Sequence, residues 1–407
     1  MPLGWIDFSK TERSKVLDVL SLLSEPGVLD ELGIASVRDG FANIFFPGTS
    51  TIQTRAKYFF VVSYIFKDFE RSKEVNPYEM KKALDKAEKD CGEHFIAENA
   101  SEEGVIGKRS LSGGSWVKRP PSEVYWAGLR QYGIFKKSNL SISEYIKVLC
   151  AEKQTKERIN VGNIKDDSRK KESQAAKEYD DAGAGDIRRR SYWKVPTYRT
   201  DWRNDYHMKL TKEEGEFLKE CICTAFPDSM LSYILRNNLR NILKVKDFQE
   251  LEGAIKLFPD EIQRDYCLAA DFSDFSYALR VIYNLIVSNG KNKKANKEME
   301  NIRPSFAKLS KVDMMAILSR VSVGKDSSLA DFLFDCQKCM AKDDLEGLKD
   351  SICKREYSLK KYKSVKTAHP GEFDVNKWFA GTYLEYRFGN AKVIIKDIFE
   401  SGVGEYA

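Results

Sequence analysis

The chain has 407 residues, of which 42% are hydrophobic and 12% aromatic, so it can form packed cores and is not disordered throughout. Lys and Arg exceed Asp and Glu by 67 to 61, a mild positive balance that permits nucleic-acid binding without requiring it. No run approaches the ~18 to 20 apolar residues of a membrane span, and the first residues lack a signal-peptide pattern. We therefore expect a cytoplasmic protein with eight reduced cysteines.

The first 45 residues predict short helices. Ser9–Glu12 has the pattern of a capping box, in which a hydroxyl and a Glu three residues later satisfy each other's backbone amides. This helix is expected to end near Ser24, before Glu25-Pro26-Gly27. Two further helices are expected over residues 28–32 and 36–45.

Residues 45–60 join these helices to the most hydrophobic run in the sequence through a turn. Gly48, after Pro47, is expected to have a positive φ. One of Thr49, Ser50 and Thr51 is expected to cap a helix that carries Arg55. We favour a helix over a strand for Tyr58–Phe66, because the apolar run is long and lacks internal breakers.

Two interpretations of this turn remain open. Free amides at a helix start, with Arg55 and Lys57 close by, are typical of an anion site. Alternatively, Arg55 pairs with Asp39 or another buried carboxylate, and the turn is structural. We favour the structural interpretation, and both require that Arg55 is fixed.

Residues 77–151 predict more helices. Pro77–Asn99 reads as a charged surface helix, and a basic loop over residues 102–121 leads to a helix that begins at Pro121. Ser141–Glu144 forms a second capping box. The two helices after the basic loop are expected to form either an ordinary helical domain or a winged-helix-like unit that exposes Trp126, Arg130, Lys136 and Lys137.

Residues 152–194 are expected to link two domains, because they are charged and poor in apolar residues. This linker ends in Arg188, Arg189, Arg190, Ser191, Tyr192, Trp193 and Lys194. Such an alternation of cations and aromatics can bind phosphates and stack on bases, although a solvated linker end is the alternative.

The remaining chain is expected to be a helical bundle. Helices are predicted from Thr211, after a cap at Asp228, and over residues 275–286, 305–321, 327–341, 345–360, 375–386 and 391–401. The fold class is therefore mainly α, with an N-terminal helical domain over 1–151, a charged linker over 152–194 and a C-terminal helical bundle over 195–407.

Several chemistries are not indicated. The three histidines, His94, His207 and His369, lie in no nucleophile motif, and no phosphate-binding, dinucleotide-binding or zincin motif occurs. Cys336 and Cys339 fall inside a predicted helix without a second pair of ligands. We expect no cofactor and no metal site. A metal-dependent nuclease remains an alternative, with Asp39 and Lys57 at its centre and Asp7, Asp271 and Asp274 as further candidate carboxylates.

The chain resembles an uncharacterised bacterial family that is catalogued as a domain of unknown function. The resemblance is carried by Gly4–Ser9 (GWIDFS), Arg38–Phe41, Phe46–Phe59 (FPGTSTIQTRAKYF), Pro121–Leu129 (PSEVYWAGL), Tyr283–Leu285 and Tyr386–Phe388. Members of this family are found beside helicase and phospholipase-D-like nuclease genes in phage-defence neighbourhoods. The resemblance thus implies an accessory role and supplies no catalytic residues.

These observations predict a non-catalytic accessory subunit of an anti-phage defence system that binds DNA and a protein partner such as a helicase or nuclease. A metal-dependent nuclease and a pure interaction scaffold are the alternatives. The residues expected to contact nucleic acid are Thr49, Ser50, Thr51, Gln53, Arg55, Lys57, Arg130, Lys136, Lys137, Arg188, Arg189, Arg190 and Trp193.

Overall fold

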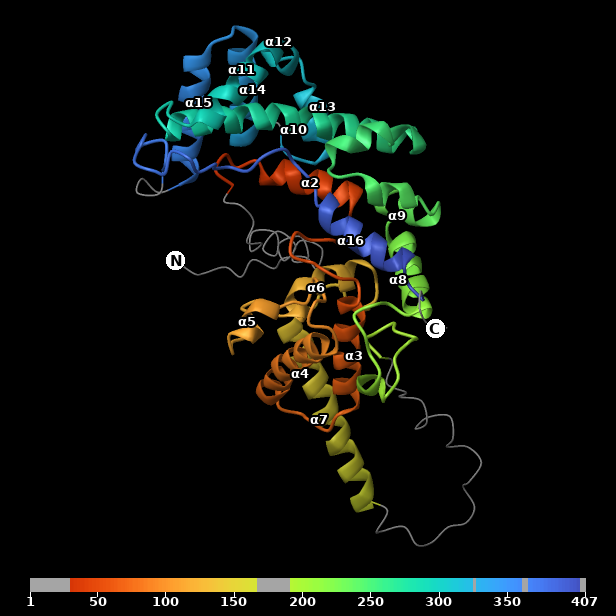
Figure 1. Cartoon of the computed structure of the whole chain (residues 1–407). Helices are drawn as coiled ribbons and strands as arrows, with labels where there is room; N and C mark the ends of the chain where they lie inside the picture. Colours follow the sequence, from red (N-terminus) through yellow and green to blue (C-terminus); the bar gives the residue numbers. More distant parts are fainter. Residues whose placement is uncertain (1–29, 167–190, 325–326, 361–364, 403–407) are drawn as a thin grey trace. The chain divides into compact units, whose positions relative to one another are not determined.

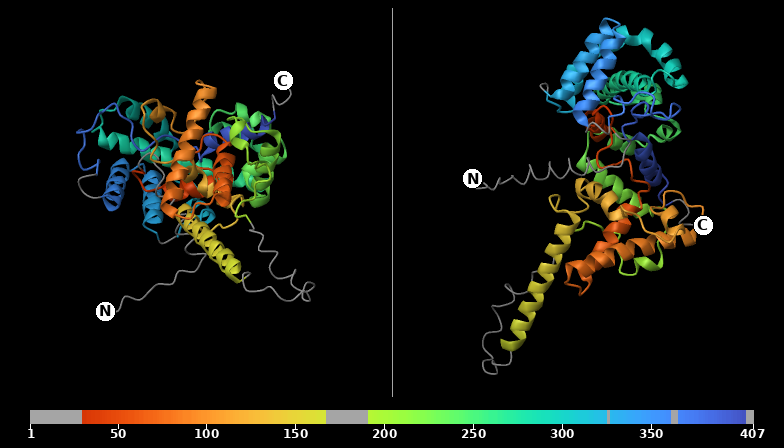
Figure 2. Two further views of the ribbon diagram at one scale, coloured as in Figure 1. Left: turned by 90° about the horizontal axis from the view of Figure 1, so that it is seen from below. Right: turned by 90° about the vertical axis from the view of Figure 1, so that its left-hand side faces the viewer.

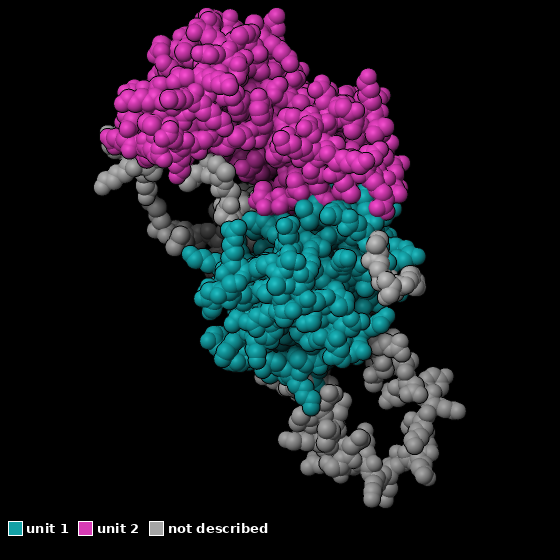
Figure 3. All heavy atoms as spheres, in the orientation of Figure 1, with its two compact units in different colours: residues 1–21, 52–227, 393–407 teal, residues 22–51, 228–392 magenta. Residues whose placement is uncertain are grey.

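The computed structural model describes residues 30–166, 191–324, 327–360 and 365–402. The protein is mainly helical, as expected, and the described part contains one isolated β-bridge, between Phe135 and Trp193 (Figure 1). Every described helix is too short or too polar to span a bilayer. The chain divides into two compact units (Figure 3), and each is described separately below.

Unit 1 contains residues 1–21, 52–227 and 393–407. Its helices are α3 (Tyr58–Arg71), α4 (Pro77–Glu98), α5 (Lys108–Ser112), α6 (Pro121–Gln131), α7 (Ile142–Asp166), η2 (Trp202–Asn204), α8 (Lys212–Ala225) and the part of α16 (Phe388–Phe399) that follows residue 392. Helix α3 contacts α4 and α6 and is buried over most of its length. Helix α7 contacts α4 and extends beyond the other helices of this unit (Figure 2).

Unit 2 contains residues 22–51 and 228–392. Its helices are α2 (Ala35–Phe45), α9 (Met230–Arg236), η3 (Arg240–Lys244), η4 (Gln249–Gly253), η5 (Ile255–Leu257), α10 (Asp260–Val287), α11 (Lys293–Ile302), η6 (Arg303–Ser305), α12 (Phe306–Leu309), α13 (Met314–Arg320), α14 (Ser328–Ala341), α15 (Leu345–Leu359) and the first turn of α16. Helix α10 is the centre of this unit, because α2, α11, α12, α13 and α15 all contact it.

The turn after α2 differs from the expectation in one respect. Gly48 has φ +75°, as predicted, and Tyr58–Phe66 is helical, as predicted. However, none of Thr49, Ser50 and Thr51 caps a helix that carries Arg55, because α3 begins only at Tyr58. The Thr49 hydroxyl instead donates a hydrogen bond to the carbonyl of Phe46, at 2.6 Å, and so closes the turn behind α2.

The segment between this turn and α3 is not helical, and other parts of unit 1 satisfy its backbone. The Tyr125 hydroxyl accepts hydrogen bonds from the amides of Thr54 and Arg55, at 2.8 and 3.0 Å, and donates to the Arg55 carbonyl. The Asp397 carboxylate accepts from the Ala56 amide at 2.7 Å. These partners take the place of the helical hydrogen bonds that the sequence pattern predicts.

Other expected elements are also changed. The capping box at Ser141 and Glu144 is present. A winged-helix unit is not confirmed: among the described residues, the loop after α6 forms one isolated bridge with Trp193, and Trp126, which such a unit would expose, is 7% exposed. Ser229, rather than Asp228, caps α9. The helix expected over 305–321 is broken into η6, α12 and α13, and the one expected over 375–386 is a loop. The expected linker begins inside α7, and the helix expected over 9–24 lies outside the described residues.

Candidate functional site

In unit 1, the segment 191–211, here called the strap, runs along α3. Trp193 attaches it: this side chain is 2% exposed, and its ring stacks on Phe66 of α3 at 5.2 Å between centroids. The Trp193 indole nitrogen donates a hydrogen bond to the Tyr145 hydroxyl at 3.0 Å. Further along the strap, Trp202 packs on Tyr64 of α3. A run of large aromatics therefore fixes a segment with little regular secondary structure.

Backbone pairing also fixes the start of the strap. The amide of Lys136 donates to the carbonyl of Tyr192, and the amide of Lys194 donates to the carbonyl of Ile134, both at 2.8 Å. The Lys136 ammonium also donates to the carbonyl of Ser191 at 3.0 Å. The loop after α6 and the strap thus present their lysines side by side.

The carboxylates of α3 under the strap are engaged mainly by neutral donors. Glu70 accepts from the Ser191 hydroxyl and the Tyr192 amide, at 2.7 and 2.8 Å. Asp68 accepts from the Tyr198 hydroxyl and the Trp202 indole, at 2.7 and 3.0 Å, and also pairs with Arg203. The carboxylates of Glu70 and Asp68 therefore bind mainly the strap's neutral donors, and they neutralise few of the cations around the strap.

We call five exposed cations on or beside the strap, none of which makes an ion pair with a described carboxylate, the strap cations: Arg71, Lys136, Lys137, Lys194 and Arg199. Arg71 lies over the Tyr198 ring, 5.3 Å from its centroid, and Lys194 lies 5.8 Å from the centroid of Phe217. Cations that lack a carboxylate partner remain available to phosphate groups.

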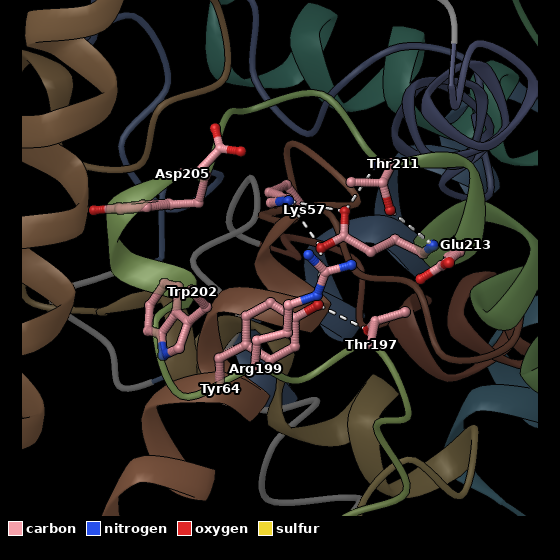
Figure 4. A pocket seen from close by; sticks show the side chains of 10 residues that line it. Lys57, Tyr64, Thr197, Arg199, Trp202, Asp205, Thr211 and Glu213 are labelled. Carbon is pink, nitrogen blue, oxygen red and sulfur yellow. Dashed lines mark hydrogen bonds and ion pairs between the residues drawn. The ribbon is translucent and has the colours of Figure 1, made fainter. Parts of the chain in front are cut away.

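A pocket of about 330 Å³ lies beside the strap (Figure 4). The side chains of Lys57, Tyr64 and Arg199 converge in it, whereas the Asp205 carboxylate points away from them. Lys57 and Glu214 are both nearly buried, and the Lys57 ammonium lies 2.8 Å from each oxygen of the Glu214 carboxylate.

The Glu214 carboxylate has further donors in the pocket. The Tyr64 hydroxyl donates to it at 2.9 Å and lies 2.8 Å from the hydroxyl of Thr197, while the Thr211 amide donates to the other oxygen. Burial, together with the nearby Glu214 charge, raises the pKa of Tyr64 far above its ordinary value, so this phenol stays protonated. Both oxygens of the Glu214 carboxylate thus have hydrogen-bond donors. We interpret this carboxylate and its ion pair with Lys57 as a structural network that joins α3 to α8 and the strap.

Arg199 is the cation in this pocket that remains open to a ligand. It is exposed and makes no ion pair with a described carboxylate, whereas Lys57 is neutralised by Glu214. A neighbouring cavity of about 570 Å³ shares Lys57, Asp205, Tyr206 and Thr211 with the pocket. There His207 lies between the carboxylates of Glu98 and Asp205, so this second cavity is lined by acids as well as bases.

Other residues expected to bind nucleic acid are held by internal contacts. Arg55 is fixed, as predicted, and the carboxylate that holds it is Asp397, at 3.0 Å, together with Glu102. Arg130 is 8% exposed and donates to the Ser138 carbonyl, and Gln53 is 1% exposed. In unit 2, the carbonyl of Thr49 accepts from Arg387 and the carbonyl of Thr51 accepts from Asn390. Ser50 is half-buried.

The expected Arg-Tyr-Trp cluster is divided between described and undescribed residues. Arg188, Arg189 and Arg190 lie outside the described residues and directly precede the strap. Trp193 lies in the aromatic cluster of unit 1, so a base has no access to its ring in this structure. Arg71 and Arg199 were not expected from the sequence. The sequence signal for Arg199 is the alternation of aromatic and basic residues that continues to Arg203, and Arg71, at the end of α3, has no such signal.

The described carboxylates considered for a nuclease lie on two helices of unit 2, Asp39 on α2 and Asp271 and Asp274 on α10. Asp39 is bonded by Arg38 at 2.8 Å and lies 3.8 Å from Arg387, and Asp7 falls outside the described residues. Among the described residues, no three His, Cys, Asp or Glu side chains are grouped so that they could hold a metal ion. Cys336 is buried in α14, where burial raises the pKa of its thiol, and Cys339 is a free thiol on the same helix.

Comparison with known family models gives a match over the N-terminal part of the chain. No curated protein and no solved structure matches the chain. Tyr283–Leu285 and Tyr386–Phe388, which contributed to the resemblance described above, lie outside the matched part. Residues 1–157 match the model of a family of unknown function, DUF6361.

Proposed function

We propose that this protein is a non-catalytic accessory subunit of a bacterial anti-phage defence system, and that it binds DNA through the strap cations. The observation that carries the DNA-binding part is the set of exposed cations around the strap that have no carboxylate partner among the described residues. The defence role and the protein partner are supported by the family resemblance of the sequence.

The strap offers an ordered surface on which phosphates can be positioned. Its backbone is fixed by Trp193 and by the bridge to Phe135, so Lys136, Lys137 and Lys194 project from an ordered surface. Binding a polyanion to such a surface releases counterions, and affinity therefore falls steeply as salt rises. Arg188, Arg189 and Arg190 would add charge directly before the strap.

The test is an anisotropy titration of a fluorescein-labelled DNA duplex with the full chain at several salt concentrations. We expect the combined variant Lys137→Ala, Lys194→Ala and Arg199→Ala to weaken binding and to reduce the slope of log K against log salt by up to about 3, since each lost phosphate contact contributes about 0.9. The control is Lys81→Ala, Lys82→Ala and Lys86→Ala, which removes the same charge from exposed positions of α4.

The outcomes separate a strap site from general attraction. Equal loss of affinity in the two triple variants would show that only net charge matters, and an absence of binding by the wild-type chain at low salt would contradict the proposal. Co-purification with a helicase or a phospholipase-D-like nuclease encoded nearby tests the partner. Failure to recover either one would leave DNA binding as the whole of the proposal.

A further inference from the structure

Unit 2 carries a second surface of mixed basic and aromatic character, on the loop where a helix was expected. Two buried asparagines anchor this loop. Asn284 of α10 donates to the Phe379 carbonyl at 3.0 Å and accepts from the Phe379 amide at 2.8 Å. Asn292, the N-cap of α11, donates to the Val375 carbonyl at 2.7 Å. The loop is therefore tied to both helices through its backbone, and its side chains have fixed positions.

Aromatic rings form a stack along this loop. Tyr383 lies parallel to Tyr277 of α10, with ring centroids 4.0 Å apart and planes at 21°, and it is 40% exposed. Trp378 lies on Tyr277 as well, at 6.4 Å and 25°. Left-handed backbone at Ala380 and Gly381 turns the chain so that the Trp378 indole donates to the Gly381 carbonyl. Because Tyr277 is buried, Tyr383 is the exposed end of a stack that is supported from below.

One lysine lies against the stack, and others lie close to it in the sequence. The Lys294 ammonium lies 4.6 Å from the Trp378 ring centroid, and Lys377 lies over Phe379. None of the exposed lysines Lys291, Lys293, Lys294, Lys297 and Lys377 makes an ion pair with a described carboxylate.

The acids of this region are partly engaged. Glu298 is hydrogen-bonded to Tyr277, and Asp374 accepts from the Asn376 amide. Glu372 lies 3.6 Å from His369. Asp274 is exposed near Tyr383 and is the acid that opposes an anion most directly.

We infer that this surface binds single-stranded nucleic acid, with a base stacked on Tyr383 and the backbone phosphates on the lysines of residues 291–297. A partly exposed ring that is supported by a buried one suits an unpaired base, which has a free face, better than a duplex, whose bases are already stacked. The lysines supply the sequence-independent attraction for phosphates. The inference rests on residues of unit 2 and does not depend on the strap cations.

The experiment compares a fluorescein-labelled oligo-dT strand with a labelled duplex of the same length, using the full chain. Tyr383→Ala is expected to weaken binding of the single strand roughly 5- to 100-fold, the usual effect of removing one stacking aromatic, and to change duplex binding little. Tyr383→Phe keeps the ring and is expected to bind like the wild type. Tyr357→Ala, a change at a 59% exposed tyrosine of α15, is the matched control.

Each result has a defined meaning. The inference is overturned if the wild type binds no oligo-dT at low salt, if Tyr383→Ala binds it as the wild type does, or if this variant loses strand and duplex equally. Thermal melting of each variant verifies folding, and Tyr383→Leu, which keeps an apolar side chain but removes the aromatic ring, is expected to lose single-strand binding and supplies a second readout if the alanine variant is unstable. A strap variant that retains all binding, combined with a loss in Tyr383→Ala, would refute the proposed strap site and support this one.

Discussion

Arg55 is held by carboxylates from two distant parts of unit 1. Asp397 lies on α16, and Glu102 lies in the loop after α4; the Arg55 side chain is 14% exposed and that of Asp397 is 7% exposed. Asp397 also accepts a hydrogen bond from the Ala56 amide, so one carboxylate both pairs with the Arg55 guanidinium and binds a backbone donor. Loss of Arg55 would leave this buried carboxylate without its counterion.

We expect Arg55→Ala to lower the free energy of unfolding by roughly 3 to 5 kcal/mol, the usual cost of orphaning a buried charge. Urea denaturation followed by circular dichroism measures the loss. Arg109→Ala, at an exposed position of α5, is the control and is expected to change stability little. If Arg55→Ala is as stable as this control, then the ion pairs of Arg55 make no net contribution to the free energy of unfolding.

Glu88 makes stability depend on pH. It is 1% exposed and accepts hydrogen bonds from the amide and hydroxyl of Ser122, at the start of α6. Burial raises the pKa of Glu88 from 4.5 to about 8, an effect that the Ser122 donors only partly oppose. The folded chain therefore keeps this proton up to about pH 8, whereas the unfolded chain releases it near pH 4.5. Because the folded state binds more protons in this window, stability falls as pH rises through it.

The variant Glu88→Gln removes this titration and keeps an acceptor for the Ser122 amide. We expect its stability to decline less than that of the wild type between pH 5 and pH 8, by up to roughly 1.4 kcal/mol per pH unit. Urea denaturation of both proteins across this range measures the difference, in which contributions of other groups cancel. If the plots of unfolding free energy against pH are parallel for the two proteins, then the pKa of Glu88 does not differ between the folded and unfolded states.

At the scale of elements, the sequence predicts what depends on neighbours in the chain. Helices α4, α14 and α15 begin and end close to the expected residues, because their N-caps, Asn76, Ser327 and Asp344, and their apolar spacing are local. The start of α3 and the loop over 375–386 were not predicted, because their backbone partners are distant in sequence. Tyr125 is about 70 residues from Arg55, and Asn284 is 95 residues from Phe379. The same reason applies to the strap cations. The sequence gives their charges, but whether a carboxylate lies beside each of them depends on residues that are distant in sequence.

The segment before α3 tests the explanation that backbone partners distant in sequence decide where this helix begins. Tyr125→Phe removes the hydroxyl that serves two amides and one carbonyl, so we expect a loss of roughly 2 to 4 kcal/mol in unfolding free energy, the cost of leaving buried polar groups unpaired. Hydrogen exchange should show faster exchange at Thr54 and Arg55 in particular. The control is Tyr78→Phe, at a tyrosine that is 73% exposed on α4. Unchanged exchange at both amides would contradict the explanation.

At the scale of the whole molecule, unit 1 is assembled from segments that are far apart in the chain. Its main part, residues 52–227, is completed by residues that follow position 392. Besides Asp397, the Gly402 amide donates to the Leu210 carbonyl at 3.2 Å, and Ser401 lies against Gly215 of α8 so closely that a Cβ there would clash. Unit 2 is likewise split, since α2 precedes the main part of unit 1 in sequence and contacts α9 and α10.

This arrangement predicts that the end of the chain stabilises residues that lie early in it. We expect a chain that stops after Lys392 to lose hydrogen-exchange protection at Ala56 and at Leu210–Thr211 and around α8, since Asp397, Ser401 and Gly402 are removed together. Amides of α14 and α15 in unit 2, which make none of these contacts, serve as the internal reference. The single change Asp397→Ala should reproduce the effect at Ala56 and spare Leu210, because only the first site depends on this carboxylate. Protection that falls equally in both units would show instead that truncation unfolds the chain as a whole, and protection that stays unchanged at Ala56 would show that α16 does not complete unit 1.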